Sequence, residues 1–412
     1  MSAMSATLSK SEQAMSSCIK TPLTHFGHAK KVTSLGWSTA GVAATGSSDT
    51  TVRCWHVEPS GSLRQCDVLK GHTGAIDALS WCPSSPSVLA SGATDRSVRL
   101  WDTRAGWRCT GTVATKGQAL SLAWTPDSGS VVMGTRDDNL VVMDVRRANS
   151  AAGGGSAVLF STSFREELNE FAFSPITGLM YVGLGVLQQG LTDQGALGIF
   201  SLGLQHQRDE GGGGSGAAAG GSGGSASSGS SGSSSSTSTS TSGGRAEAPP
   251  PPAATGAPQA APQVHFSEVA RIGCHTAPIT HLRFSPDGRW LATGSGDSSV
   301  CLWDSAEMCV VGMFDRAEAQ LRGVSWSRDG AHLAVASGDR EDSAKILEIV
   351  RVADGTRVVS MPCPAAINPG CISWAPHANL LAYAVEDCNS PRLSEKPGGE
   401  KFEAGALKLL TF

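Results

Sequence analysis

A pattern of about 40 residues recurs along this chain of 412 residues. One copy, GHTGAIDALSWCPSSPSVLASGATDRSVRLWDTR, runs from Gly71 to Arg104. A second copy runs from Cys274 to Ser305, and a third, degraded copy runs from Gly27 to Val57. A period of about 40–45 residues is typical of four-stranded propeller blades, which bury their faces only by stacking on neighbouring blades. The repeat therefore predicts a ring of β-sheets and favours a binding platform over an enzyme.

The number of blades follows from one bulky residue in the innermost strand of each expected blade. These residues are Trp37, Trp81, Trp124, Phe173, Phe284, Trp326 and Trp374. Five of the six separations lie between 42 and 49 residues, and the sixth contains a tract rich in Gly, Ser, Ala and Pro. Without that tract the period is restored, so we expect an all-β, seven-bladed propeller. An exposed sheet edge would be avoided if 21–26 supplied the outer strand of the last blade, beside 406–412.

The domain organisation expected from these patterns has four parts. Residues 1–20 are small and polar and predict a disordered tail, and 205–263 predict a disordered low-complexity insertion. Residues 21–204 hold blades 1–4 with the closing strand. Residues 264–412 hold the outer strand of blade 4 and blades 5–7.

Composition argues against several classes of protein. The formal net charge is −4 and 17% of residues are charged, so no basic surface predicts binding to nucleic acid. The 11 cysteines include no CxxC pair and suit a reducing, cytosolic or nuclear compartment. The N-terminal residues have no apolar core of a signal peptide, and no run of 18 apolar residues predicts a membrane span.

Three blades repeat a set of histidine, hydroxyl, aspartate and tryptophan residues. The sets are His28, Thr45, Asp49 and Trp55; His72, Ser91, Asp95 and Trp101; and His275, Thr293, Asp297 and Trp303. Ser, His and Asp together could form a catalytic triad. Three copies at equivalent blade positions instead favour buried structural tetrads, linked from indole to hydroxyl to imidazole to carboxylate. With no phosphate-binding loop, metal-ligand cluster or carboxylate pair, we expect no catalytic, cofactor, metal or small-molecule site.

Contacts with partner proteins are expected on loops and on one short motif. Trp101–Arg104 has the form WDxR, which resembles the motif by which some propellers bind the adaptor of a cullin-RING ubiquitin ligase. Arginine at this place also commonly pairs with a neighbouring acid. The candidate partner-binding residues are Arg96, Asp102, Arg104, Arg136, Asp138, Arg340 and Glu341; a solvated loop charge is the alternative for each.

The repeats resemble the WD40-repeat family and, over nearly the whole chain, its THO complex subunit 3 family. The likeness is carried by 115–147, with Lys-Gly in place of Gly-His, by the unusual fourth repeat at 164–174, and by 321–341 and 371–387. The tract 205–263 and the insertion 388–403 depart from that family. Alternatives are a ligase substrate receptor using WDxR and a chromatin propeller that binds a histone peptide at the channel mouth.

The resemblance implies a nuclear, non-enzymatic scaffold subunit of a THO/TREX-like complex. Such a subunit couples transcription to messenger ribonucleoprotein assembly and mRNA export. Its implied partners are large helical subunits and a second propeller, with RNA contacted only through them.

Overall fold

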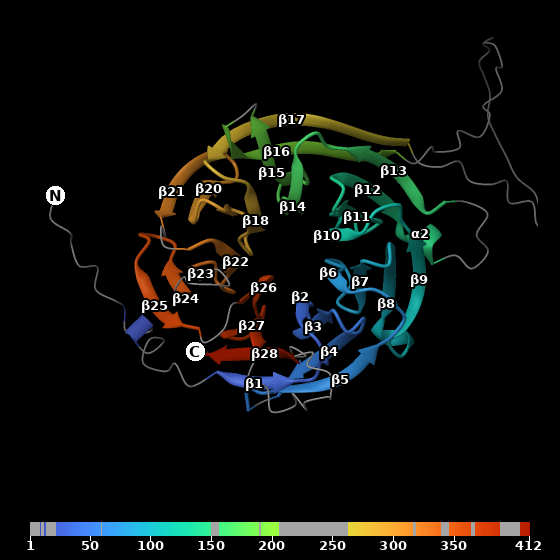
Figure 1. Ribbon diagram of the computed structural model, residues 1–412, viewed down its shortest axis with the longest axis horizontal. Helices are drawn as coiled ribbons and strands as arrows, with labels where there is room; N and C mark the ends of the chain where they lie inside the picture. The colour runs from blue at the N-terminus through green and yellow to red at the C-terminus, as the bar shows by residue number, and fades with distance from the viewer. Residues whose placement is uncertain are drawn as a thin grey trace, which may run out of the picture. The chain divides into compact units, whose positions relative to one another are not determined.

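The computed structural model describes residues 9, 12–13, 22–58, 60–149, 156–188, 191–205, 263–315, 319–338, 346–363, 367–387 and 404–412. Over these residues the chain forms seven antiparallel sheets of four strands each, arranged as blades around a central axis (Figure 1). The predicted all-β, seven-bladed propeller is therefore confirmed.

Blades 1 to 3 are each formed by four consecutive strands, ordered from the central axis outwards. Blade 1 contains β2 (Val32–Trp37), β3 (Val42–Ser47), β4 (Val52–Val57) and β5 (Leu63–Leu69). Blade 2 contains β6 (Ile76–Trp81), β7 (Val88–Ala93), β8 (Ser97–Asp102) and β9 (Arg108–Ala114), with the 3₁₀ turn η1 (Thr103–Ala105) before β9. Blade 3 contains β10 (Ala119–Trp124), β11 (Ser130–Thr135), β12 (Asn139–Asp144) and β13 (Val158–Ser163), with the short helix α2 (Val145–Ala148) after β12.

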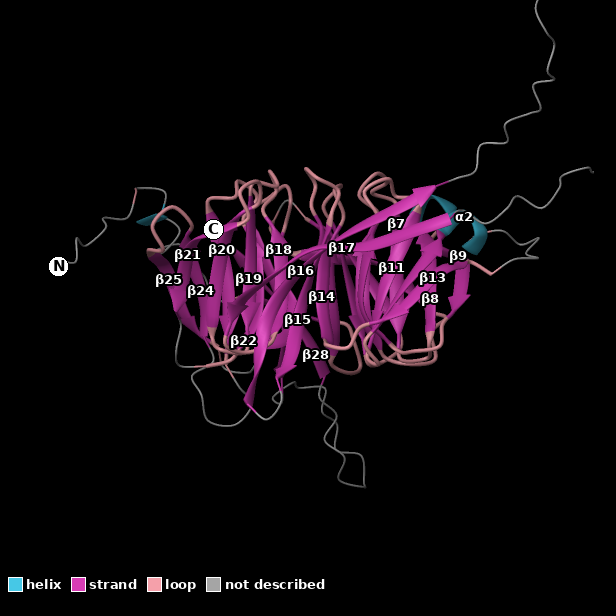
Figure 2. Ribbon diagram, turned by 90° about the horizontal axis from the view of Figure 1, so that it is seen from above, coloured by secondary structure: helices cyan, strands magenta, loops and turns pink. Residues whose placement is uncertain are grey.

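Blades 4 to 6 repeat this order. Blade 4 contains β14 (Glu167–Phe173), β15 (Met180–Gln188), β16 (Leu191–Gln205) and β17 (Gln263–His275). Blade 5 contains β18 (Ile279–Phe284), β19 (Trp290–Ser295), β20 (Ser299–Asp304) and β21 (Cys309–Asp315). Blade 6 contains β22 (Leu321–Trp326), β23 (His332–Ser337), β24 (Ile346–Arg351) and β25 (Arg357–Pro362). In Figure 2 the connecting loops gather on two faces, and α2 lies on one of them.

Blade 7 combines strands from both ends of the described chain. Its inner strands are β26 (Ile367–Trp374), β27 (Leu380–Asp387) and β28 (Ala404–Thr411), and its outer strand is β1 (Leu23–Phe26). The antiparallel register of β1 on β28 pairs Leu23 with Leu409 and Phe26 with Ala406. Because β1 covers the edge of β28, backbone N–H and C=O groups that would face solvent are paired.

The turns between the first and second strands have a local cause that is visible in the sequence. In blade 5 the carboxylate of Asp287 accepts hydrogen bonds from Ser285 Oγ (2.6 Å) and from the backbone N–H of Arg289 (3.1 Å). Gly288 has φ +74°, a backbone conformation that glycine adopts without steric cost. Ser327 and Asp329 repeat the 2.6 Å contact in blade 6, so the same residue types set the same turn.

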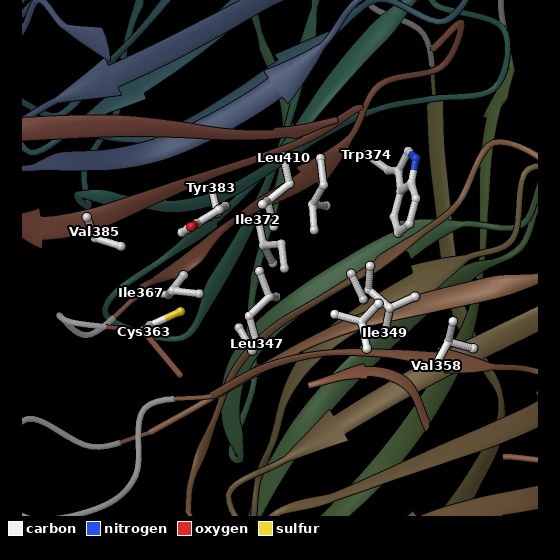
Figure 3. Packing of buried hydrophobic residues seen from close by; sticks show 14 of the residues in the cluster. Leu347, Ile349, Val358, Cys363, Ile367, Ile372, Trp374, Tyr383, Val385 and Leu410 are labelled. Atoms are coloured by element: carbon white, nitrogen blue, oxygen red, sulfur yellow. The ribbon is translucent and has the colours of Figure 1, made fainter. Parts of the chain in front are cut away.

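The hydrophobic core lies between adjacent blades. One cluster packs blade 6 against blade 7, with Leu347 and Ile349 facing Tyr383 and Leu410, and all four are at most 1% exposed (Figure 3). Small residues permit this close stacking. A Cβ on Gly92 of blade 2 would lie 2.6 Å from the Cβ of Ala119 in blade 3. Blade faces are therefore packed too tightly to accept one additional methyl group there.

The parts of the chain outside the blades were expected to be disordered. Residues 206–262 lie outside the described residues, as do most of residues 1–20. Within the expected tail, however, Glu12 and Gln13 are helical and Glu12 is only 5% exposed. The structure departs from the expectation at this point because the Glu12 carboxylate is paired with Arg351 of blade 6. Among the described residues, no helix has the length and apolar character needed to cross a membrane.

Candidate functional site

The structure brings the four predicted residues of blade 2 together in one buried chain of hydrogen bonds. Trp101 Nε1 donates to Ser91 Oγ (2.8 Å), Ser91 Oγ lies 2.8 Å from His72 Nε2, and His72 Nδ1 lies 2.9 Å from Asp95 Oδ2. Ser91 is 0% exposed. Strand β7 supplies the hydroxyl and β8 supplies the indole, while the β7–β8 turn supplies the carboxylate and the connection between β5 and β6 supplies the imidazole.

Blades 1 and 5 reproduce this arrangement. In blade 1, Thr45 Oγ1 lies 2.9 Å from Trp55 Nε1 and 2.8 Å from His28 Nε2, and His28 Nδ1 lies 3.0 Å from Asp49 Oδ2. The corresponding distances in blade 5, among Trp303, Thr293, His275 and Asp297, are 3.0, 3.0 and 3.2 Å. The three sets therefore share one geometry.

The positions of the protons follow from the charges. Burial opposes ionisation of Asp95, but hydrogen bonds from Ser97, from the Thr73 backbone and from His72 lower its pKa to about 2. Burial lowers the pKa of His72, although Asp95 acts in the opposite direction. The carboxylate only accepts, so Nδ1 of the neutral imidazole donates to it and Nε2 accepts. Ser91 then donates to His72 and accepts from Trp101, which leaves its Oγ enclosed by two partners.

Each set also contains a second hydroxyl, which was not among the predicted residues. Ser97 Oγ donates to Asp95 Oδ1 (2.7 Å), and Thr51 and Ser299 make the same contact with Asp49 and Asp297 at 2.6 Å. A hydroxyl two residues after each aspartate was the available signal, because Asx turns place it beside the carboxylate.

The WDxR motif forms a closed contact at its own turn. Arg104 donates from Nε to Asp102 Oδ1 (3.1 Å) and from Nη2 to Asp102 Oδ2 (2.8 Å). The backbone N–H of Arg104 also donates to Asp102 Oδ1 (2.8 Å). The Arg104 side chain is 70% exposed. The pairing of this arginine with a neighbouring acid, one of the two interpretations of the motif, is thus present here.

Three other predicted contact residues, Arg96, Arg136 and Asp138, lie on turns between second and third strands. Arg96 is exposed, with φ 60°. Arg136 donates to Asp77 Oδ2 (2.7 Å), and Asp138 accepts from the backbone N–H of Leu168 (2.9 Å), so both connect neighbouring blades. The last two candidates, Arg340 and Glu341, lie outside the described residues.

A central channel of about 680 Å³ is lined by the inner strands of several blades. One charged contact on its lining was not predicted. Glu170 of β14 accepts from the backbone N–H of Leu282 (2.9 Å), pairs with Arg283, and lies 3.8 Å from His281 Nδ1. Burial opposes ionisation of Glu170, but Arg283 and His281 outweigh it and lower its pKa to about 2. Both charges of the pair are thereby satisfied between blades 4 and 5.

A second hollow, which we call the rim groove, lies between the outer strand of blade 5 and the β24–β25 turn of blade 6. It has a volume of about 840 Å³ and is lined by Glu12, Met313, His332, Arg351 and neighbouring residues. No local sequence pattern indicates this groove, because its lining comes from three distant segments of the chain. Among the described residues, no cluster of three or more His, Cys, Asp or Glu side chains could hold a metal ion.

Comparisons with known proteins agree with this architecture. The family model described as "WD domain, G-beta repeat" matches residues 17–56, 63–102 and 266–304. The solved β-propeller domain of Cps50 (Swd1) from Myceliophteria thermophila covers 95% of this chain with all of its own length, at a TM-score of 0.62 and 15% identity. That likeness concerns the fold alone.

Two curated relatives extend the comparison to the sequence. WD repeat-containing protein AAC3 of Dictyostelium discoideum is 26% identical over 74% of this chain and 52% of its own length. THO complex subunit 3 of Arabidopsis thaliana is 30% identical over 88% of this chain and 89% of its own length. Near-complete coverage of both chains at that identity, on a seven-bladed ring, shows that this chain belongs to the WD40-repeat family and, within it, to the THO complex subunit 3 family.

Proposed function

We propose that the protein is a non-enzymatic scaffold subunit of a THO/TREX-like assembly in the nucleus, where it couples transcription to messenger ribonucleoprotein assembly and mRNA export. The observation that carries the proposal is the similarity to THO complex subunit 3 along nearly the full length of both chains. Large helical subunits and a second propeller are its partners, and RNA is contacted through them. A formal net charge of −4 supports that division of roles, because phosphate binding needs clustered positive charge.

The buried hydroxyls support the non-catalytic part of the proposal. A nucleophilic serine or threonine must reach a substrate and pass its proton to a base. Ser91 and Thr293 are 0% exposed and each is bound by a tryptophan indole, so no substrate atom can approach the oxygen. We assign the tetrads to stabilisation of the blades.

Affinity purification from nuclear extract tests the scaffold role. The tagged full-length chain is expected to recover the large helical THO subunits, and a tagged propeller of another family serves as the control. A folded chain that recovers none of these subunits would contradict the proposal. Recovery of a ligase adaptor that is lost in an Arg104→Ala variant would favour the substrate-receptor alternative, since Arg104 must leave Asp102 to bind it.

A further inference from the structure

The rim groove has a wall of apolar side chains and a charged floor. Strand β21 contributes the wall, on which Val311 is 49% exposed and Met313 is 61% exposed. Arg351 ends β24 on the floor, and its Nη1 donates to Asp354 Oδ2 (2.8 Å), which fixes the plane of the guanidinium. A volume of about 840 Å³ lies within the range of ligand-binding pockets, and Glu12 is one of the lining residues, so this space stays open while the glutamate is bound to Arg351.

The floor binds a carboxylate in a two-pronged geometry. Arg351 Nε donates to Glu12 Oε1 and Nη2 donates to Glu12 Oε2, both at 2.5 Å, and His332 Nε2 lies 3.3 Å from Oε1. The hydrogen bonds from Arg351 hold the pKa of Glu12 well below its usual range, despite its burial. Paired N–H groups of arginine match the two oxygens of a carboxylate, so this floor selects an acidic group by shape as well as charge.

Glu12 lies in a helical turn with a capping box, in which the backbone N–H of Gln13 donates to the Ser9 carbonyl oxygen (2.8 Å). Ser9 Oγ accepts from the backbone N–H of Glu12 (3.3 Å), and the Glu12 carboxylate accepts from the backbone N–H of Ser9 (2.7 Å). In Figure 1 this turn lies at the outer rim beside β24 and β25. Placing Glu12 on the floor requires Ser9, Glu12 and Gln13 to be ordered, which costs conformational entropy. A partner helix that forms before binding avoids that cost.

We propose that the rim groove is a docking site for an acidic helical segment of a partner protein, and that Glu12 occupies its charged floor within the same chain until a partner displaces it. The partner segment carries a glutamate for Arg351 and His332 and an apolar side chain for the wall formed by Val311 and Met313. The proposal goes beyond the scaffold role, because it assigns a surface and the chemistry of the segment that binds there.

The test uses the purified full-length protein and a fluorescein-labelled synthetic peptide of residues 7–15, TLSKSEQAM. In wild-type protein the attached turn competes at an effective concentration of about millimolar. Glu12→Gln weakens that competitor, so fluorescence anisotropy should show peptide binding to this variant at least tenfold tighter than to wild type. A peptide with glutamine in place of its glutamate should lose this binding.

Variants in the Glu12→Gln background locate the site. Arg351→Gln should abolish peptide binding. Met313→Asp, at a position that is 61% exposed, should weaken it at least tenfold by removing an apolar contact and repelling the glutamate of the peptide. Arg64→Gln is the matched control, because Arg64 is an exposed arginine paired with Glu58 at 3.6 Å on another blade, and should leave binding unchanged.

Three results would overturn the proposal. They are equal peptide affinity for wild type and Glu12→Gln, no measurable binding to either, and binding that survives Met313→Asp. Sedimentation velocity tests whether the turn in the groove comes from a second copy of the chain. A wild-type dimer that becomes a monomer in Glu12→Gln would show that it does, and would also overturn the proposal. Since no other protein is present, failure of this experiment leaves the nuclear scaffold role to be judged by its own purification test.

Discussion

Replacing Ser91 with alanine removes one oxygen and should destabilise the ring more than the loss of one hydrogen bond suggests. The Ser91 hydroxyl satisfies two buried groups, Trp101 Nε1 and His72 Nε2, each at 2.8 Å. Trp101 is 2% exposed and His72 is 5% exposed, so water does not replace the oxygen. An unsatisfied buried polar group costs about 1–3 kcal/mol, which gives about 2–6 kcal/mol for the two groups before the structure relaxes.

Equilibrium unfolding in urea, followed by tryptophan fluorescence, measures this loss of free energy of unfolding. Ser84→Ala, in an exposed turn of the same blade, is the matched control and should change it by less than about 0.5 kcal/mol. A double-mutant cycle with Trp101→Phe removes the indole N–H as well. Because that N–H has already lost its acceptor in Ser91→Ala, the second substitution should cost less there than in wild type. A Ser91→Ala protein as stable as the Ser84→Ala control, with strictly additive effects in the cycle, would refute the tetrad argument.

Three further substitutions test other parts of the fold. Trp101→Ala should cost about 3–5 kcal/mol, because it empties a core position between blades 1 and 2, and an unchanged melting temperature would contradict its burial. Gly405→Ala should destabilise by about 1–3 kcal/mol, since its Cβ would lie 2.4 Å from the Lys30 carbonyl oxygen, whereas Gly273→Ala meets no atom within 4 Å and should be neutral in the same melt. The pKa of Asp95 is lowered to about 2, so the stabilisation from its carboxylate is complete above the unfolded value of about 3.9 and is lost as pH falls through 2. In Asp95→Asn the urea midpoint should therefore depend less on pH between about 4 and 2 than in wild type. The same pH dependence in both proteins would count against the pairing.

The fold could be predicted from the sequence because each blade repeats the same short-range signals. An aromatic residue ends each of the seven inner strands, and a turn follows that is of the Pro-Asp-Gly type in several blades. The residues of each tetrad lie within about 30 residues of one another. Such patterns are readable locally and recur often enough to fix the number of blades. The members of each histidine-containing set lie within one repeat, so the three sets are also recognisable from the sequence.

The charged contacts of the site could not be predicted, because they join residues that are distant in the chain. Glu12 and Arg351 are 339 residues apart, and Glu170 and Arg283 are 113 apart. The capping box at Ser9 and Glu12 was a legible signal for a helical turn, but the polar composition around it favoured disorder. Nothing in the local sequence indicates that Arg351 ends a strand whose terminus faces this turn.

Blades that lack a tetrad are stabilised by other contacts, including these long-range ion pairs. Among the described residues, only blades 1, 2 and 5 have the complete set. In blade 6 the tryptophan position is taken by Val350, which pairs with Leu333 as Trp101 pairs with Leu89 and packs without any hydrogen bond from its side chain. In blade 4, the rings of Phe200 and Phe266 stack between the third and outer strands, with 5.0 Å between their centroids. In blade 7, β1 pairs with the edge strand β28. The β24–β25 turn of blade 6 instead relies on Arg351 and its two carboxylates, one of which comes from the N-terminal turn. A partner that supplies its own carboxylate can therefore replace Glu12 without leaving the Arg351 charge unpaired, which makes exchange at this rim cheaper than simple removal of the turn.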